Sequence, residues 1–107
     1  MIFYETTIFT EQVTSLLDDN SYAELQQNLI ADPEAGSLIR LSRGLRKIRW
    51  KLSGKGKSGG IRVIYYLVCS EEIFLLYAYP KSKQENITED QARILRSLVE
   101  THLKSNE

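Results

Sequence analysis

The sequence predicts a single α+β domain: a small antiparallel sheet packed against an N-terminal helical hairpin and a C-terminal helix. Three observations support this prediction. The chain has 107 residues, which is the length of one domain. Its 42% hydrophobic residues suffice to fill one core. Apolar residues alternate with the period of strands in the middle of the chain and recur with the period of helices towards both ends. The expected order of elements is β-α-α-β-β-β-α.

The first third of the chain is expected to form one strand followed by two helices. Ile2–Ile8 is mostly apolar and β-branched, which is typical of a strand. Thr10 is expected to cap a short helix, and Ser21 is expected to begin the second helix, with Glu24 completing a capping box. Pro33 should end the second helix, because proline disfavours the helical conformation in the preceding residue.

The middle of the chain predicts three consecutive strands. Apolar and basic residues alternate over Leu45–Leu52, which indicates a half-exposed strand with a basic outer face. Ile61–Val68 and Ile73–Tyr79 are apolar almost throughout, as is typical of central strands that are covered on both faces. The glycine-rich segment SGKGKSGG (residues 53–60) should form the turn between the first two strands. Thr88 is expected to begin the last helix with a capping box.

Charge is balanced overall but distributed very unevenly. The chain has no Asp or Glu between Glu34 and Glu71, and this interval carries a charge of +9. The remaining chain contains 5 basic and 14 acidic residues, which gives −9. Such asymmetry indicates a polyanionic partner for one face, the alternative being an ordinary solvated surface. The nine cations are Arg40, Arg43, Arg46, Lys47, Arg49, Lys51, Lys55, Lys57 and Arg62.

Composition argues against metal sites and membrane insertion. Cys69 is the only cysteine and is expected to be a buried, inert thiol, because it lies in an apolar run. One cysteine and one histidine cannot form a zinc cluster, and no cofactor is predicted. Glu5 interrupts the apolar N-terminus, which therefore does not resemble a signal peptide. No apolar run approaches the roughly 18 residues of a membrane span. A cytoplasmic location is expected.

Two motifs are more simply explained without catalysis. The segment GKGKS resembles part of a Walker A motif, but Lys51 stands where that motif needs glycine. A strand beginning at Ile61 also follows where a helix would be required, so a nucleotide triphosphate site is excluded. His102 lies near the end of the last predicted helix, where a capping or edge role is favoured over acid–base chemistry.

A third arrangement follows from the predicted order of strands. In an antiparallel meander, the end of one strand lies beside the start of the next, so distant cations meet at one edge of the sheet. Cations beside aromatic rings suit single-stranded RNA, although lysines can also simply protect a sheet edge. A lone arginine opening an apolar strand, Arg62, is expected at the sheet rim, where it could bind a phosphate bidentately. The residues expected at this edge are Lys51, Arg62, Lys81 and Lys83, with Lys55, Lys57, Tyr77 and Tyr79 nearby.

These segments resemble the RelE-type toxins of the HigB-like branch of the RelE/ParE superfamily. The resemblance covers nearly the whole chain and rests on FYETTIF, GLRKIRW, GKGKSGGIRVIYYL and LLYAYPKSKQENIT. Members of this family enter the ribosomal A site and cut mRNA by attack of a ribose 2′-hydroxyl on the neighbouring phosphate. The resemblance also implies a cognate antitoxin, expected to be a small helix-turn-helix DNA-binding protein.

The resemblance assigns roles to individual residues. Arg62 matches the arginine that binds the phosphate, Lys55 and Lys57 fall where the family places catalytic lysines, and Lys81 belongs to the basic cluster after the last strand. In the family a tyrosine beyond that cluster stacks on the cut base; this chain has Thr88 nearby, so Tyr77 or Tyr79 is expected instead. The remaining expected RNA or ribosome contacts are Arg43, Arg46, Lys47, Arg49, Lys51 and Lys83.

Two other functions fit the same pattern. A non-catalytic RNA- or ribosome-binding module would also need the basic face. A gyrase poison of the ParE type belongs to the same superfamily, but that class lacks the lysine-rich set formed here by Lys55, Lys57 and Lys81. Cleavage of mRNA in a translation extract would distinguish an enzyme from a binding module.

Overall fold

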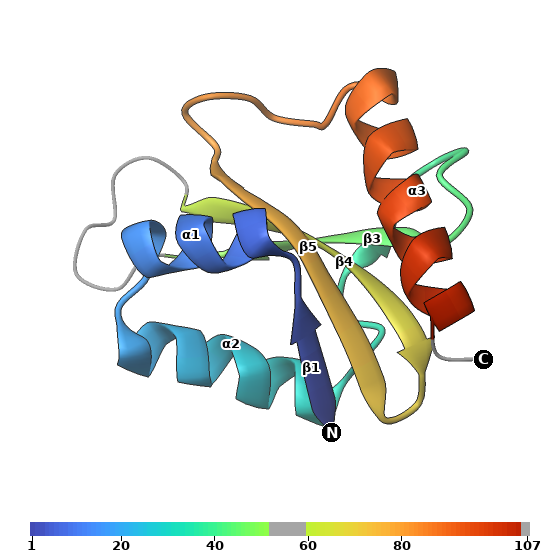
Figure 1. The fold of residues 1–107 in the computed structure, drawn as a ribbon. Helices are drawn as coiled ribbons and strands as arrows, with labels where there is room; N and C mark the ends of the chain where they lie inside the picture. Colours follow the sequence, from blue (N-terminus) through green and yellow to red (C-terminus); the bar gives the residue numbers. More distant parts are fainter. Residues whose placement is uncertain (52–59, 106–107) are drawn as a thin grey trace.

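The computed structural model describes residues 1–51 and 60–105 as three helices and a five-stranded sheet (Figure 1). The α+β class is confirmed. The sheet has the strand order β1-β5-β4-β3-β2. The elements are β1 (Ile2–Glu5), α1 (Thr7–Leu16), α2 (Asp19–Ala31), β2 (Ser37–Leu38), β3 (Leu45–Trp50), β4 (Ile61–Cys69), β5 (Glu72–Pro80) and α3 (Glu89–Ser105).

The three central strands form the predicted antiparallel meander, but the complete sheet is mixed. Strand β1 pairs with β5 in parallel, and its Ile2 amide donates to the carbonyl oxygen of Glu71 at 2.8 Å. The prediction of a wholly antiparallel sheet was wrong at this edge. Parallel pairing needs a long crossover, and the helices and strands between β1 and β5 provide it. The short strand β2, which pairs with β3 at the other edge, was not predicted.

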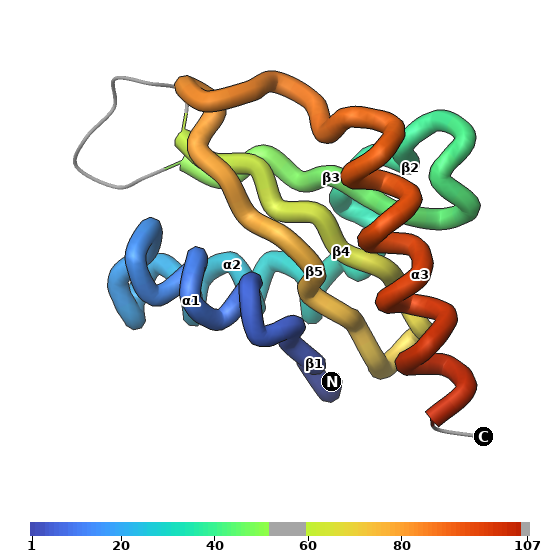
Figure 2. Tube along the Cα trace, turned by 45° about the horizontal axis from the view of Figure 1, so that its top comes forward, coloured from blue at the N-terminus to red at the C-terminus, as the bar shows by residue number. Residues whose placement is uncertain are grey.

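The sheet has a hydrophobic core on each face. One cluster joins α1 and α2 to the sheet through residues such as Phe9, Leu25 and Val63. The other joins α3 to the opposite face through residues such as Leu95 and Ile64. Figure 2 shows α3 and the pair α1–α2 on different sides of β4 and β5. The prediction that both strands are covered on two faces is therefore confirmed.

Both N-terminal helices begin earlier than predicted. The N-cap of α1 is Thr6 and that of α2 is Asp18, whose carboxylate accepts from the amide of Ser21 at 2.7 Å. Thr10 and Ser21 therefore lie inside helices. The hydroxyl of Thr6 donates to the carbonyl oxygen of Leu76 on β5 at 2.8 Å, so a tertiary contact helps to fix where β1 ends and α1 begins.

The predicted start of α3 is confirmed. The hydroxyl of Thr88 accepts from the amide of Gln91 at 3.0 Å, and the Gln91 side chain accepts from the amide of Thr88 at 2.9 Å. This reciprocal pair is the predicted capping box. The capping box fixes the residue at which the loop after β5 ends and α3 begins. That loop carries Glu85 and Asn86, which contact Arg62 and Lys47.

Two residues considered in the sequence lie outside that site. Cys69 is exposed at the turn between β4 and β5, so the expectation of a buried thiol was wrong. The reason is that Cys69 is the last residue of β4, at the turn to β5, where its side chain reaches solvent. The imidazole of His102 packs against the rings of Tyr4 and Phe74, with centroid distances of 4.5 Å and 4.4 Å.

Candidate functional site

The ends of the three central strands form one edge, as the meander predicted. The strand register aligns Trp50 of β3 with Ile61 of β4 and Pro80 of β5. Lys81 follows directly, and its amide donates to the carbonyl oxygen of Gly60 at 3.0 Å. The structure therefore brings the backbone positions of Lys51 and Lys81, which follow β3 and β5, to the same edge of the sheet.

Next to this edge, cations and aromatic rings cross the sheet in two rows. Arg49, Arg62 and Tyr79 are cross-strand partners on β3, β4 and β5. The second row lies two residues further along the strands and consists of Lys47 on β3, Ile64 on β4 and Tyr77 on β5. Directly paired residues of antiparallel strands point to the same face of a sheet, so the side chains of both rows share a face. It is the face on which α3 packs, because Tyr79 belongs to the core beneath that helix.

Arg62 lies inside this face and not at the rim where the sequence placed it. Only 4% of Arg62 is exposed. Its Nε and Nη2 atoms each donate to Oε2 of Glu85 at 3.4 Å, and its Nη1 donates to the carbonyl oxygen of Ile61 at 3.3 Å. The predicted rim position was wrong because β4 is central, with a strand on each side, and the loop after β5 brings Glu85 to the guanidinium.

Glu85 is a component of the site that the sequence analysis missed. It is the only acidic residue between Glu72 and Glu89, a segment whose other charged residues are Lys81 and Lys83, and this isolation was the available signal. Partial removal from water raises the pKa of Glu85. The charge and hydrogen bonds of Arg62, with smaller contributions from Lys81 and Lys47, lower this pKa by a larger amount. The net effect is a pKa below the ordinary value, so the carboxylate is ionised at neutral pH.

The two tyrosines expected to stack on RNA differ in access. Tyr79 is 3% exposed, and its hydroxyl donates to the carbonyl oxygen of Glu85 at 3.2 Å. Burial raises the pKa of Tyr79, which remains neutral. A stacking role for Tyr79 is therefore contradicted by its burial. Tyr77 is partly exposed and lines a groove between α1 and the end of β5, together with Lys83.

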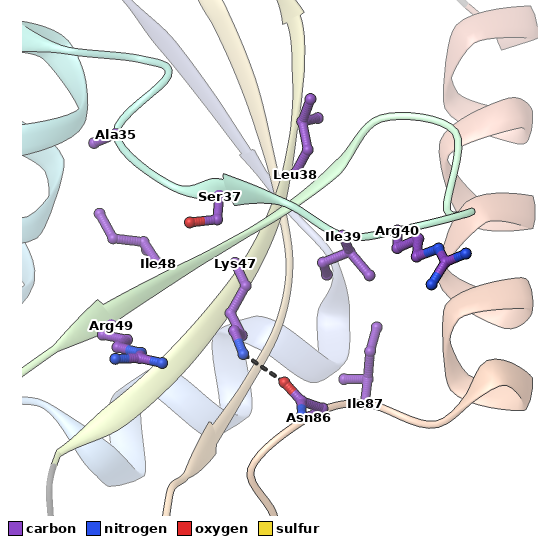
Figure 3. A pocket seen from close by; sticks show the side chains of 10 residues that line it. All are labelled: Ala35, Ser37, Leu38, Ile39, Arg40, Lys47, Ile48, Arg49, Asn86 and Ile87. Carbon is purple, nitrogen blue, oxygen red and sulfur yellow. Dashed lines mark hydrogen bonds between the residues drawn. The ribbon is translucent and has the colours of Figure 1, made fainter.

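A groove of about 780 Å³ lies beside the two rows and is open to solvent (Figure 3). Lys47 and Arg49 reach into it from β3, Arg40 lies at its end nearest α3, and Ile39 and Ile87 supply apolar surface. The ammonium group of Lys47 donates to Oδ1 of Asn86 at 2.5 Å, which ties the loop after β5 to β3. Cations beside apolar surface can bind phosphates and the less polar parts of nucleotides at the same time.

Two of the predicted RNA-binding arginines make structural contacts elsewhere. Arg43, in the loop before β3, forms an ion pair with Glu100 of α3 at 2.7 Å. The guanidinium of Arg46 donates to the carbonyl oxygens of Glu34 and Gly36, at 3.3 Å and 2.7 Å. Arg43 is thus distant from the shared edge, as expected, and both arginines stabilise the connections around β2.

The sequence matches one family model across most of its length. Residues 10–107 match the family described as the RelE toxin of the RelE / RelB toxin-antitoxin system. The chain belongs to this RelE toxin family. It is therefore the toxin of a toxin–antitoxin system and has a cognate antitoxin as its partner. The finer placement in the HigB-like branch remains a prediction.

Three further expectations for this RelE-family toxin concern its catalytic lysines, metal binding and membrane insertion. Lys55 and Lys57 lie outside the described residues, so their positions relative to Arg62 remain predictions. Within residues 1–51 and 60–105, no group of three or more His, Cys, Asp or Glu side chains is placed to hold a metal ion. None of the three helices in these residues combines the length and the apolar composition that a membrane span requires.

Proposed function

We propose that this toxin is a ribosome-dependent mRNA endonuclease that acts in the ribosomal A site and thereby inhibits translation. The observation that carries the proposal is the cross-strand pair Arg49–Arg62, flanked by Lys47 and Lys81, beside a groove with mixed basic and apolar walls. Membership of the RelE family supports it, because RelE toxins are generally ribonucleases that act on mRNA. No cofactor is needed for this chemistry.

In the proposed reaction, a ribose 2′-hydroxyl loses its proton and attacks the adjacent phosphorus. The bond from phosphorus to the 5′ oxygen of the next nucleotide breaks, and that oxygen takes up a proton, so the products are a cyclic phosphate end and a 5′-hydroxyl end. The reaction needs proton removal, in-line orientation and stabilisation of a crowded, highly charged phosphorane. The guanidinium groups of Arg62 and Arg49 are suited to stabilisation but not to proton removal, because arginine stays protonated. Lys55 and Lys57 are the proposed proton acceptors, since neighbouring cations favour the neutral form of a lysine. Lys81 is proposed to neutralise the phosphate.

The state of the site supports the proposed dependence on the ribosome. In the structure, Glu85 engages Arg62. The single histidine of the chain, His102, packs against Tyr4 and Phe74. Such a site is poorly prepared to align an unconstrained RNA chain. A ribosome that holds the mRNA in place could supply several kcal/mol of the barrier through orientation alone.

The test is primer extension on mRNA incubated with purified ribosomes and the toxin. New mRNA ends should form with ribosomes and not on naked RNA. Arg49→Gln should reduce the rate about tenfold or more, because one stabilising cation is lost from the site. Arg93→Gln removes the same charge from α3, where the exposed side chain of Arg93 pairs with Asp90, and serves as the matched control. Equal cleavage of naked RNA, or no new ends with ribosomes, would contradict the proposal.

A non-catalytic ribosome-binding module is the second candidate. The observation that favours it is the engagement of Arg62 by Glu85, which is compatible with a surface that binds RNA without cutting it. Binding in ribosome pelleting experiments without new mRNA ends would support this function. Trapped gyrase–DNA breaks would instead indicate a ParE-type poison.

We also infer the kind of antitoxin that binds this toxin. The family resemblance implies a small helix-turn-helix protein. The cationic face of the toxin and its short exposed edge strand, β2, favour an acidic or strand-forming segment in that partner. Co-expression with the neighbouring gene should yield a co-purifying complex and relieve toxicity. Harmless expression of the toxin alone, with no neighbouring product bound, would contradict this inference.

A further inference from the structure

The contact between Glu85 and Arg62 has a geometry that a phosphate would use. The Nε and Nη2 atoms form the side of the guanidinium that binds two oxygens of a phosphate or carboxylate. Both atoms point here at a single oxygen, Oε2 of Glu85, at 3.4 Å. A phosphate oxygen and this carboxylate oxygen cannot occupy the same donors at once.

The contact is long, and one side of it faces solvent. The side chain of Glu85 is 45% exposed whereas that of Arg62 is 4% exposed. A charged hydrogen bond at 3.4 Å is weaker than one at the usual 2.7–2.9 Å. The exposed carboxylate can regain water when it leaves, so a competing anion can displace it at modest cost.

The loop that carries Glu85 is held independently of that carboxylate. Asn86 accepts from Lys47 at 2.5 Å, and the backbone carbonyl of Glu85 accepts from Tyr79 at 3.2 Å. Gln84 donates to the side chain of Gln91 at 3.0 Å, beside the capping box of α3. The Glu85 side chain can therefore rotate away from Arg62 while its backbone stays in place.

We propose that Glu85 determines the specificity of the site for ribosome-bound mRNA by occupying the phosphate position on Arg62 in the free protein. The inference rests on the proposed function, in which Arg62 contacts the phosphate that is cut. Free RNA must displace the carboxylate with its own binding energy. RNA held beside the site by the ribosome has a high effective concentration and displaces it readily. Glu85 is thus a specificity-determining residue and not a catalytic one.

The test compares Glu85→Gln with a matched variant, Glu100→Gln. Both changes remove one negative charge from an ion-paired carboxylate, and the two glutamate side chains are 45% and 44% exposed. The probe is a fluorescent single-stranded RNA with 2′-O-methyl riboses, which cannot be cleaved by 2′-hydroxyl attack. Fluorescence anisotropy should show that Glu85→Gln tightens RNA binding roughly fivefold more than Glu100→Gln, as expected for release of one weak charged contact. Glu85→Ala should show the same gain in RNA affinity. Unlike Glu85→Gln, it leaves no amide oxygen that could take the place of the carboxylate on Arg62.

A cleavage assay separates this inference from a catalytic role. Glu85→Gln is expected to cut ribosome-bound mRNA at least as fast as the unmodified toxin and to gain measurable cleavage of naked RNA. Equal RNA affinities for Glu85→Gln and Glu100→Gln would overturn the inference. So would loss of ribosomal cleavage with unchanged RNA affinity, which would identify Glu85 as a proton carrier. If the unmodified toxin cuts no mRNA but Glu85→Gln still binds RNA more tightly, the proposed function fails and the competition between carboxylate and phosphate stands.

Discussion

At the scale of single residues, Arg62 combines almost complete burial with a permanent charge. Arg62→Ala should lower the free energy of unfolding by about 1–3 kcal/mol, because it removes packed side-chain atoms and the hydrogen bonds to Glu85 and Ile61. It should also slow cleavage by about 10²–10³-fold through loss of charge stabilisation. Urea denaturation and primer extension with ribosomes measure the two effects.

Arg49→Ala is the control for stability, since Arg49 is the exposed cross-strand partner of Arg62. Its loss should change stability by no more than about 0.5 kcal/mol. If Arg62→Ala were as stable as Arg49→Ala, the buried contacts of Arg62 would contribute nothing to folding. Near-normal cleavage by Arg62→Ala would place the active site elsewhere.

The contact between Glu85 and Arg62 should make a contribution to the free energy of unfolding that depends on pH. Removal from water raises the pKa of Glu85, and Arg62 with its neighbouring lysines lowers it more, to below the ordinary 4.5. A pKa that is lower in the folded than in the unfolded state stabilises the fold above about pH 4.5, and this contribution is lost as the pH falls through the lower folded pKa. The stability difference between the unmodified chain and Glu85→Gln should therefore be constant near neutrality and shrink in acid. Denaturation curves from pH 7 to about pH 3 test this; a difference independent of pH would contradict it.

At the scale of elements, the start of α2 depends on Asp18. Its carboxylate accepts from the amide of Ser21 at 2.7 Å. Asp18→Ala should lower the free energy of unfolding by about 1 kcal/mol, the usual cost of losing an N-cap. Asp19→Ala, which removes a charge from the first turn but no cap, should cost only about 0.3 kcal/mol. Thermal unfolding of both variants measures the difference, and equal losses would contradict the assignment of Asp18 as the cap.

The entry into β4 depends on Gly60. Its φ of +74° is unfavourable for other residues, and an added Cβ would lie 2.2 Å from the carbonyl oxygen of Trp50. Gly60→Ala should therefore destabilise the protein by about 2 kcal/mol or more. Gly44→Ala is the comparison, because its Cβ would meet the movable ring of Tyr66 at 2.9 Å. Chemical denaturation should rank Gly60→Ala as the more destabilising change. The reverse order would mean that the backbone at Trp50 and Gly60 can move apart at little cost and make room for the added Cβ.

At the scale of the whole molecule, the segregation of charge predicts strong salt dependence of RNA binding. Each phosphate neutralised on a single strand contributes a slope of about −0.7 to log affinity against log salt concentration. Four contacts on the basic face should give a slope of roughly −3, and Arg49→Gln should reduce its magnitude by about 0.7. Anisotropy titrations at several KCl concentrations measure the slope. A flat response would rule out phosphate binding as the main source of affinity.

The sequence alone determined the class of fold and the position of the basic face. Alternation over β3 placed Lys47 and Arg49 on one face, and the apolar runs of β4 and β5 correctly predicted central strands. The order of these strands then located the shared edge that precedes Lys81. These features could be predicted because periodicity is local and neighbouring antiparallel strands have few ways to connect.

Only the tertiary structure decided the parallel pairing of β1, the cap at Thr6 and the state of Arg62. Strand β1 pairs with β5, and Arg62 pairs with Glu85, both distant in the sequence. The Thr6 hydroxyl caps α1 by accepting from the nearby amide of Phe9 and also donates to the distant carbonyl oxygen of Leu76. A strand pattern shows which face a side chain occupies but not what covers that face. The loop after β5 has no periodicity from which its path could be inferred, so the meeting of Glu85 with Arg62 followed only from how the chain packs.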